Sequence, residues 1–395
     1  MKVLHLNQWG THAGGVEGYI AEVSAALRQR GHFSHLVYFA DHDPGDLLPA
    51  STHVPLGDGS ASVAKAMQAI ERVIDKFQPD VAYLHAVYSP ELIDRLTQRL
   101  PTVAYAHSPY LACPGSAQFL RRSERTCPHR PGPICFWSAQ KERCCWGRNP
   151  MLHARFLLRV YRFKQAYRRI GRILLAGAFM QRLLVRVGFM PEKIHVLPPI
   201  LLSDVWFDSS PEPRPDQILY AGRLVQEKGL GHLLVALSQV ETKWRLLVAG
   251  DGPARGQYQD LACRLDMADR VEFVGWLSPQ EIKTALQSSA CVAMPSLWPE
   301  PFGRLGAEAF ACARPVVAFA SGGVVDWLEH QVTGFLVAPG DVEGLAQGIQ
   351  RLVQDPAVCQ RMGQRAREYA WSHWRCSEHV DRLLEHLESV CRRLL

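Results

Sequence analysis

The chain has little that would place it in a membrane or outside the cell. Its apolar runs, such as Ile173–Met180, are too short to cross a bilayer. The N-terminal stretch MKVLHLNQ has no hydrophobic region followed by a cleavage site and is typical of a first β-strand. We find no low-complexity tract and no short-period repeat. We therefore expect a globular, cytoplasmic protein that can also lie peripherally on the inner face of the membrane.

Acidic residues are missing from one long stretch. Residues 143–191 contain no Asp or Glu but 11 Lys and Arg. Residues 1–200 carry 25 Lys and Arg against 14 Asp and Glu, whereas the remainder carries 19 against 24. This asymmetry predicts an anionic partner for the first half of the chain.

The length and the alternation of elements predict an α/β fold. A chain of 395 residues fits two domains of about 200 residues each. Apolar strand candidates alternate with amphipathic stretches in both halves, which favours parallel sheets covered on both faces. We expect two Rossmann-like domains, residues 1–200 and 201–372, facing each other across a cleft. The C-terminal helix, residues 373–395, is expected to pack back on the first domain.

Three glycine-bearing turns at expected strand ends are candidates for ligand binding. Gly14 and Gly15 open a helix, and glycines there let backbone N–H groups approach an anion. Arg223 and Lys228 lie in the loop of YAGRLVQEKGL, where two cations can clamp a diphosphate. Gly275 and its neighbour Trp276 end a strand and could meet a nucleobase. Each motif alone is equally compatible with a plain turn or a surface salt bridge.

The stretch PEPFGRLGAEA is the most informative. A helix beginning near Gly303 leaves the amides of Gly303, Arg304 and Leu305 unpaired, and these can hold a phosphate. Carboxylates are pure acceptors and suit paired sugar hydroxyls. We therefore expect Glu308 to bind a ribose and Glu300 a hexose, with the diphosphate between them.

Taken together, these motifs resemble the retaining GT-B glycosyltransferases of family 4. The resemblance rests on Gly14-Gly15, GRLVQEKG, VAGDGP, FVGWL, EPFGRLGAE and SGGVVDWLEHQVTGFLVAPGD, in that order along nearly the whole chain. It implies transfer of a sugar from a UDP- or GDP-sugar, with retention at the anomeric carbon and without a required metal or other cofactor. It also implies that His107 and Glu300 act at the transferring sugar, with Phe302 beside Glu300. For His107 the alternative is a structural histidine at a strand end.

The segment 111–150 carries five cysteines and is long for a connection. Their spacing is not a paired C-x2-C pattern, so structural zinc and reduced packing cysteines both remain open. These residues are Cys113, Cys127, Cys135, Cys144 and Cys145.

The following segment, 151–172, is predicted to be a basic amphipathic helix. Its arginines can contact an anionic membrane or a phosphate-linked acceptor, and a packed helix with a solvated basic face is the alternative. The arginines are Arg155, Arg159, Arg162 and Arg169.

The function predicted from the resemblance is assembly of a cell-surface polysaccharide or glycolipid on a saccharide or lipid-linked acceptor. A nucleotide-sugar epimerase or a phosphorylase on the same fold remains open. Nucleic-acid binding through the basic segment is another alternative, but no module with stacking aromatic residues supports it, and we expect no nucleic-acid partner.

Overall fold

The computed structural model describes residues 1–11, 14–41, 43–57, 59–145, 149–199, 203–208 and 213–392. Backbone contacts divide the chain into two compact units. Unit 1 comprises Met1–Ala117, Pro128–Leu201 and Cys376–Leu395, and unit 2 comprises Gln118–Cys127 and Leu202–Arg375. In the described ranges, no helix has the length and apolar character needed to cross a membrane.

Unit 1 is built on a seven-stranded sheet with the order β3-β2-β1-β4-β5-β8-β9. Every pairing in it is parallel. The strands are β1 (Lys2–Asn7), β2 (Phe33–Tyr38), β3 (Ser51–His53), β4 (Val81–Leu84), β5 (Thr102–Ala106), β8 (Arg172–Leu175) and β9 (Ile194–Val196). Since β1, β4 and β5 are neighbours, residues at their carboxyl ends come together at one edge of the sheet.

Helices cover both faces of this sheet. The helices of unit 1 are α1 (Gly15–Gln29), α2 (Ser60–Phe77), α3 (Pro90–Leu96), α4 (Ile134–Glu142), α5 (Pro150–Ala166), α6 (Ala178–Arg186) and α13 (Cys376–Cys391). On one face, Tyr19 of α1 and Leu383 of α13 pack against Val3 and Tyr83 of the sheet. On the other face, Leu4 and Leu6 belong to a larger core that includes residues of α2, α3, α5 and α6. Successive residues of β1 thus point to opposite cores, as a doubly covered strand requires.

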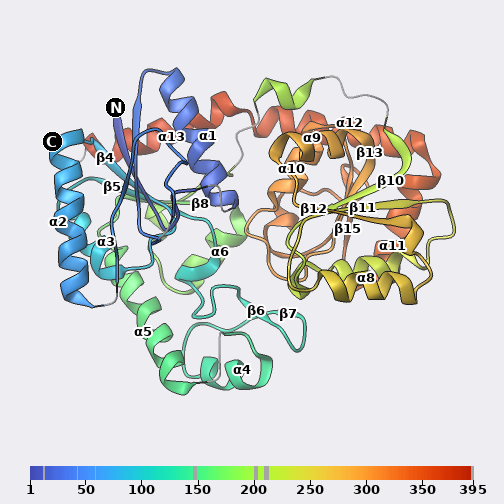
Figure 1. Cartoon of the computed structure of the whole chain (residues 1–395), viewed down its shortest axis with the longest axis horizontal. Coiled ribbons are helices and arrows are strands. Elements are labelled where there is room, and N and C mark those ends of the chain that lie inside the picture. The colour runs from blue at the N-terminus through green and yellow to red at the C-terminus, as the bar shows by residue number, and fades with distance from the viewer. Residues whose placement is uncertain are drawn as a thin grey trace. The chain divides into compact units, whose positions relative to one another are not determined.

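Unit 2 contains a six-stranded parallel sheet with the order β12-β11-β10-β13-β14-β15. Its strands are β10 (Arg214–Ala221), β11 (Arg245–Ala249), β12 (Val271–Gly275), β13 (Ser289–Met294), β14 (Val316–Phe319) and β15 (Gly334–Val337). Its helices are α7 (Leu230–Leu237), α8 (Arg255–Arg264), α9 (Pro279–Ser288), α10 (Arg304–Ala311), α11 (Val342–Gln354) and α12 (Pro356–His373). Helices α9 and α10 lie on one side of the sheet, with α8 and α11 on the other (Figure 1).

A short hairpin from the first half of the sequence belongs to unit 2. Strands β6 (Phe119–Leu120) and β7 (Arg125–Thr126) pair antiparallel. The hairpin contacts the loop that follows β10, because Glu124 accepts a 2.8 Å hydrogen bond from Gln226. Arg121 also pairs with Glu227 at 2.7 Å. Unit 2 is therefore made of two separate stretches of sequence.

The predicted α/β architecture with two parallel sheets is confirmed. The basic helix is shorter than predicted, since α5 ends at Ala166 rather than at residue 172. The chain then turns into β8, and a side chain at Gly171 would collide with Val390. Strands β3, β6 and β7 were not anticipated; each is only two or three residues long. Part of segment 111–150 lies outside the described residues.

Candidate active site

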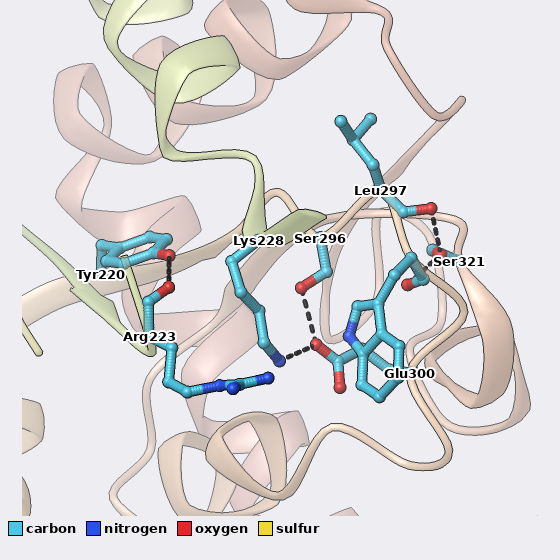
Figure 2. Close-up of polar contacts among 8 residues, drawn as sticks. Tyr220, Arg223, Lys228, Ser296, Leu297, Glu300 and Ser321 are labelled. Carbon is cyan, nitrogen blue, oxygen red and sulfur yellow. Dashed lines mark hydrogen bonds and ion pairs between the residues drawn. The ribbon is translucent and has the colours of Figure 1, made fainter. Parts of the chain in front are cut away.

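A group of hydrogen-bonded polar side chains in unit 2 surrounds Glu300. Lys228 lies in the turn after β10, and Ser296 and Glu300 lie in the loop after β13. Because β10 and β13 are adjacent, their carboxyl ends bring these residues together although 72 positions separate Lys228 from Glu300. The Lys228 Nζ lies 2.5 Å from Glu300 Oε1, and Ser296 Oγ donates to the same oxygen at 2.6 Å (Figure 2).

The carboxyl group of Glu300 is buried and ionised. Glu300 as a whole is 7% exposed. Burial by itself would raise the pKa of Glu300, but the charge of Lys228 and the hydrogen bonds from its neighbours, including Lys228 and Ser296, together outweigh burial. The net result is a lowered pKa. A fixed acceptor is thus held inside unit 2, and its Oε1 is already occupied by the two donors.

Helix α10 begins beside this pair without a side-chain cap. Its N-cap residue Gly303 has a φ of 88°, in the left-handed region. An added Cβ there would approach Met294 Cε to 2.9 Å, so glycine fits both the conformation and the space. In the first turn the Gly306 amide donates to the Gly303 carbonyl at 2.9 Å. Amides at a helix start point along its axis, so those at the start of α10 can bind an anion.

A hollow of about 240 Å³ joins these features. Its lining combines one acid, two cations and backbone from the start of α10. The lining residues that the sequence had singled out are Lys228, Glu300, Gly303, Arg304 and Leu305. The structure therefore brings these five predicted residues to one place.

Glu308 is joined to this group through Arg304. Arg304 Nε donates to Glu308 Oε1 at 2.7 Å, one turn along α10. The side chain of Arg223 is exposed and extends toward Lys228 and Glu300 (Figure 2). Tyr220 supports this loop, since its hydroxyl donates to the Arg223 carbonyl at 3.4 Å.

Phe302, Gly275 and Trp276 are placed differently. Phe302 is 5% exposed and its carbonyl accepts a 2.7 Å hydrogen bond from the Trp327 indole, so its ring belongs to the core. Gly275 ends β12 at the sheet edge with a φ of 77°, and the Trp276 side chain is 69% exposed. Neither Gly275 nor Trp276 lines the hollow beside Glu300.

The first-half candidates lie in unit 1. Gly14 is the N-cap of α1 and, like Gly15, is exposed; the helix has no side-chain cap. His107 follows β5 at the carboxyl edge of the sheet and is partly exposed. His107 Nε2 lies 3.0 Å from His85 Nδ1, and His85 Nε2 lies 3.1 Å from His5 Nδ1. Sequence reasoning missed His5 and His85, as it missed Ser296.

These three histidines are neutral. Burial lowers the pKa of His5 and that of His107 to about 3. Burial also lowers the pKa of His85, and its two histidine neighbours add to the effect. An uncharged imidazole has one N–H donor and one acceptor nitrogen, so each ring can donate a hydrogen bond at one nitrogen and accept one at the other.

The predicted basic stripe is divided by the structure. Arg155 and Arg162 are exposed on α5. Arg159 is half-buried, with its guanidinium 5.0 Å from the centre of the Phe156 ring. Arg169 lies beyond the helix and pairs with Asp94 at 2.5 Å. The four arginines are therefore not one continuous solvated face.

The zinc hypothesis finds no support in the described residues, where no group of three or more His, Cys, Asp or Glu could hold a metal ion. Of the five cysteines, Cys145 is buried, and the others are half-buried: Cys113, Cys127, Cys135 and Cys144. Cys144 and Cys145 interact with each other, which together with burial raises the pKa of Cys144. They pack tightly on Gly115, where an added Cβ would lie 3.0 Å from Cys145 Sγ.

The two α/β units, each with parallel strands, define the GT-B class of fold. Comparison with known sequences agrees. The family model described as glycosyl transferases group 1 matches residues 204–369, and the one described as glycosyltransferase family 4 matches residues 13–201. The chain therefore belongs to this family of glycosyltransferases.

Similarity to individual proteins is more distant. An uncharacterized glycosyltransferase of Methanocaldococcus jannaschii is 33% identical over 140 residues, covering 35% of this chain and 36% of the relative. An alpha-D-kanosaminyltransferase of Streptomyces kanamyceticus is 30% identical over 190 residues, covering 44% and 49%. The chain thus spans between a third and half of the length of these curated relatives.

Among solved structures, Anabaena HepE in complex with UDP superposes with a TM-score of 0.73. That match is 21% identical and covers 98% of this chain and 100% of HepE. At this level of identity, the likeness concerns the fold.

Proposed function

We propose that the protein is a retaining glycosyltransferase that transfers a sugar from a nucleoside-diphosphate sugar held in unit 2. The observation that carries this proposal is the ionised Glu300–Lys228 pair beside the uncapped start of α10. A single hollow there offers donors for phosphate oxygens and an acceptor for hydroxyl groups. HepE, which has the same fold, is described in complex with UDP.

Each side chain has a distinct role in this proposal. Lys228, Arg223 and the α10 amides bind the diphosphate and stabilise the charge that develops on it as the sugar leaves. Positive charge from these groups can serve where other enzymes use a metal ion. Glu300 accepts hydrogen bonds from sugar hydroxyls, and Glu308 accepts them from the ribose.

Donor binding requires a change in the pairing seen here. A bound diphosphate competes with Glu300 for the Lys228 amine, and a bound ribose competes with Arg304 for Glu308. When Lys228 turns toward phosphate, Glu300 Oε1 becomes available to the sugar. Each of the two ion pairs thus balances a carboxylate of the proposed site with a cation before the donor binds.

The proposal also includes retention of anomeric configuration by attack on the face that the nucleotide leaves. In this route, the leaving diphosphate oxygen takes the proton of the acceptor hydroxyl as the new glycosidic bond forms. His107 orients the transferring sugar from unit 1. Gly14 and Gly15 are further candidates for the diphosphate, through the exposed start of α1.

The test is donor binding followed by turnover. UDP-, GDP- and ADP-sugars are screened for thermal stabilisation of the full chain, and slow hydrolysis of the best donor is followed by proton NMR. The proposal expects selective stabilisation by one nucleotide and first release of the sugar with the donor's anomeric configuration. Release of the inverted anomer refutes retention. Conversion of the donor sugar to its epimer would instead support the epimerase alternative, and no binding by any donor refutes the site.

The acceptor is proposed to be a saccharide or lipid-linked molecule at an anionic membrane surface. Large apolar side chains are exposed on α4 and α5: Ile134, Trp137, Met151, Leu158 and Tyr161. They lie among the basic residues of unit 1, a combination that suits an interfacial helix. A nearby hollow of about 490 Å³ adds the cations Arg130, Lys164 and Arg186 without any acid in its lining.

Vesicle sedimentation tests this part separately. Vesicles with 30% phosphatidylserine should retain the wild-type protein, whereas purely zwitterionic vesicles should not. The Trp137→Ala/Met151→Ala variant should bind less. Trp276→Ala should bind like the wild type, although Trp276, in unit 2, is more exposed than Trp137. Equal binding of all three proteins refutes the proposed surface, and retention on both kinds of vesicle refutes its electrostatic part.

A further inference from the structure

A row of three imidazoles runs across the sheet of unit 1 to its carboxyl edge. His5 lies within β1, His85 directly follows β4, and His107 directly follows β5. The two links between the rings measure 3.1 Å and 3.0 Å. His5 and His85 are fully buried, at 0% and 1% exposure, so that water does not compete for these bonds.

The connections fix how protons are distributed along the row. Each link joins the Nδ1 of one ring to the Nε2 of the next: His5 Nδ1 meets His85 Nε2, and His85 Nδ1 meets His107 Nε2. A hydrogen bond needs one N–H and one bare nitrogen. If His85 carries its proton on Nδ1, His5 must also carry it on Nδ1, and so must His107. In the opposite arrangement all three carry it on Nε2, and mixed arrangements break a buried hydrogen bond.

The inner end of the row is adaptable. His5 Nε2 lies 3.3 Å from Ser34 Oγ and 3.5 Å from Ser24 Oγ. A hydroxyl can donate or accept, so the serines are compatible with both arrangements. The outer end is His107 Nδ1, for which no partner occurs among the described residues. This nitrogen is a donor in the first arrangement and an acceptor in the second.

We propose that His5 and His85 are positioning residues that set, through this row, whether His107 Nδ1 donates or accepts a hydrogen bond at the transferring sugar. The proposal rests on the proposed function for the role of His107. It concerns the distribution of protons within the row and involves no net proton transfer. Holding a catalytic imidazole in one tautomer is a known way for a buried partner to affect turnover.

Nitrogen NMR of histidine-labelled protein tests the row without reference to activity. The ring ¹⁵N shifts, assigned with single variants, distinguish the two neutral tautomers. We expect His5, His85 and His107 to share one tautomer, and a saturating donor to leave them sharing one. Different tautomers on neighbouring rings, or a charged imidazolium at pH 7, would overturn the proposal even if the protein transfers sugar.

Removing the two serine hydroxyls at the inner end of the row allows a prediction of which tautomer the row adopts. In Ser24→Ala/Ser34→Ala, an N–H on His5 Nε2 loses its acceptors, and a buried N–H without a partner costs more than a bare nitrogen. The row should therefore adopt the Nδ1–H form, including on His107, two rings away. A variant in which His5 carries its proton on Nδ1 while His107 carries it on Nε2 would show that the row does not transmit the proton arrangement.

Kinetics then separate positioning from folding. His85→Phe keeps a ring but removes both links, and we expect kcat to fall roughly 10-fold or more while UDP affinity changes less than about twofold. Tyr83→Phe is the control, because Tyr83 is buried next to His85 but bonds to Tyr19 instead of the row. An equal loss in UDP affinity, or an unchanged kcat, would contradict the positioning role.

Discussion

The amine of Lys228 and the carboxylate of Glu300 lie 2.5 Å apart in unit 2, although 72 residues of sequence separate them. Two strands that are not consecutive, β10 and β13, hold them together. The two side chains are mostly buried, and each charge compensates the other. The pair therefore stabilises the fold and prepares the proposed donor site.

Lys228→Met should destabilise the protein by about 3 kcal/mol at pH 7, because Glu300 would remain buried without its counter-charge. The lowered pKa of Glu300 means that the pair stabilises the fold above the carboxyl's unfolded pKa. That contribution disappears as the pH falls through the lowered pKa. The difference in free energy of unfolding between the variant and the wild type should therefore become smaller in acid. Urea unfolding at several pH values measures this difference.

A matched control for this prediction is Lys243→Met. Lys243 approaches Asp216 only to 3.8 Å and its side chain is 80% exposed, so its loss should change stability little. Lys228→Met/Glu300→Gln should recover part of the stability lost in the single variant. A loss in Lys228→Met that is the same at every pH would contradict the assignment.

Glu308→Ala should abolish discrimination between a ribose and a 2′-deoxyribose. A hydrogen bond to a charged group contributes about 1.5–3 kcal/mol, so the wild type should prefer UDP over 2′-deoxy-UDP by roughly 10-fold or more. Titration calorimetry with both nucleotides checks the preference. Glu343→Ala, on the exposed face of α11, should keep it. A preference that survives in Glu308→Ala would place the ribose elsewhere.

Gly229→Ala should weaken both the fold and donor binding. Gly229 follows Lys228 with a φ of 71°, and an added Cβ would lie 1.8 Å from the Pro295 carbonyl oxygen. The backbone conformation alone costs about 1–3 kcal/mol, and relieving the clash must move the Lys228 turn away from β13. Thermal unfolding with and without UDP measures both effects.

Gly256→Ala is the control for that experiment. Gly256 lies in α8, and an added Cβ there meets no atom within 4 Å. Alanine also favours the helix, so the variant should be as stable as the wild type or slightly more stable. If Gly229→Ala unfolded at the wild-type temperature and kept full UDP affinity, the close approach to Pro295 would not matter.

Glu124→Ala should loosen the turn that carries Lys228. Glu124 bonds to Gln226 and lies 3.3 Å from His232, on either side of that turn. These contacts are partly exposed, so we expect opening of residues 226–232 to become easier by about 0.5–1 kcal/mol. Hydrogen exchange read by mass spectrometry measures this opening. Arg122→Ala, an exposed position in the same hairpin, should leave the exchange unchanged, and equal exchange in both variants would refute the bracing role.

Local patterns in the sequence predict the two sheets because their strands are continuous apolar runs bounded by glycine turns. The start of α10 was also predictable, since Gly303 precedes a clear helical pattern. The pairing of Lys228 with Glu300 was not, because it depends on β10 crossing over to lie beside β13. The hairpin left no signal either: its strands have two residues each and its sequence is mostly polar.

The histidine row could have been found. Three apolar runs, KVLHLN, VAYLHA and VAYAHS, each carry a histidine on the face that also bears Tyr83 and Tyr105. Period-two alternation places them on one side of the sheet. What the sequence could not supply is the order β1-β4-β5, which makes the three strands neighbours.

The origin of the hairpin has a consequence for the way this protein can be recombined with its relatives. A chimera that exchanges only residues 202–375 would bring in a new Lys228 turn but keep the old residues 118–127. Glu124 and Arg121 would then contact a turn whose side chains come from a different protein. A transplant intended to alter nucleotide choice therefore needs two crossover regions, and libraries that shuffle the chain at one boundary should yield weakened turns even when both parents are active.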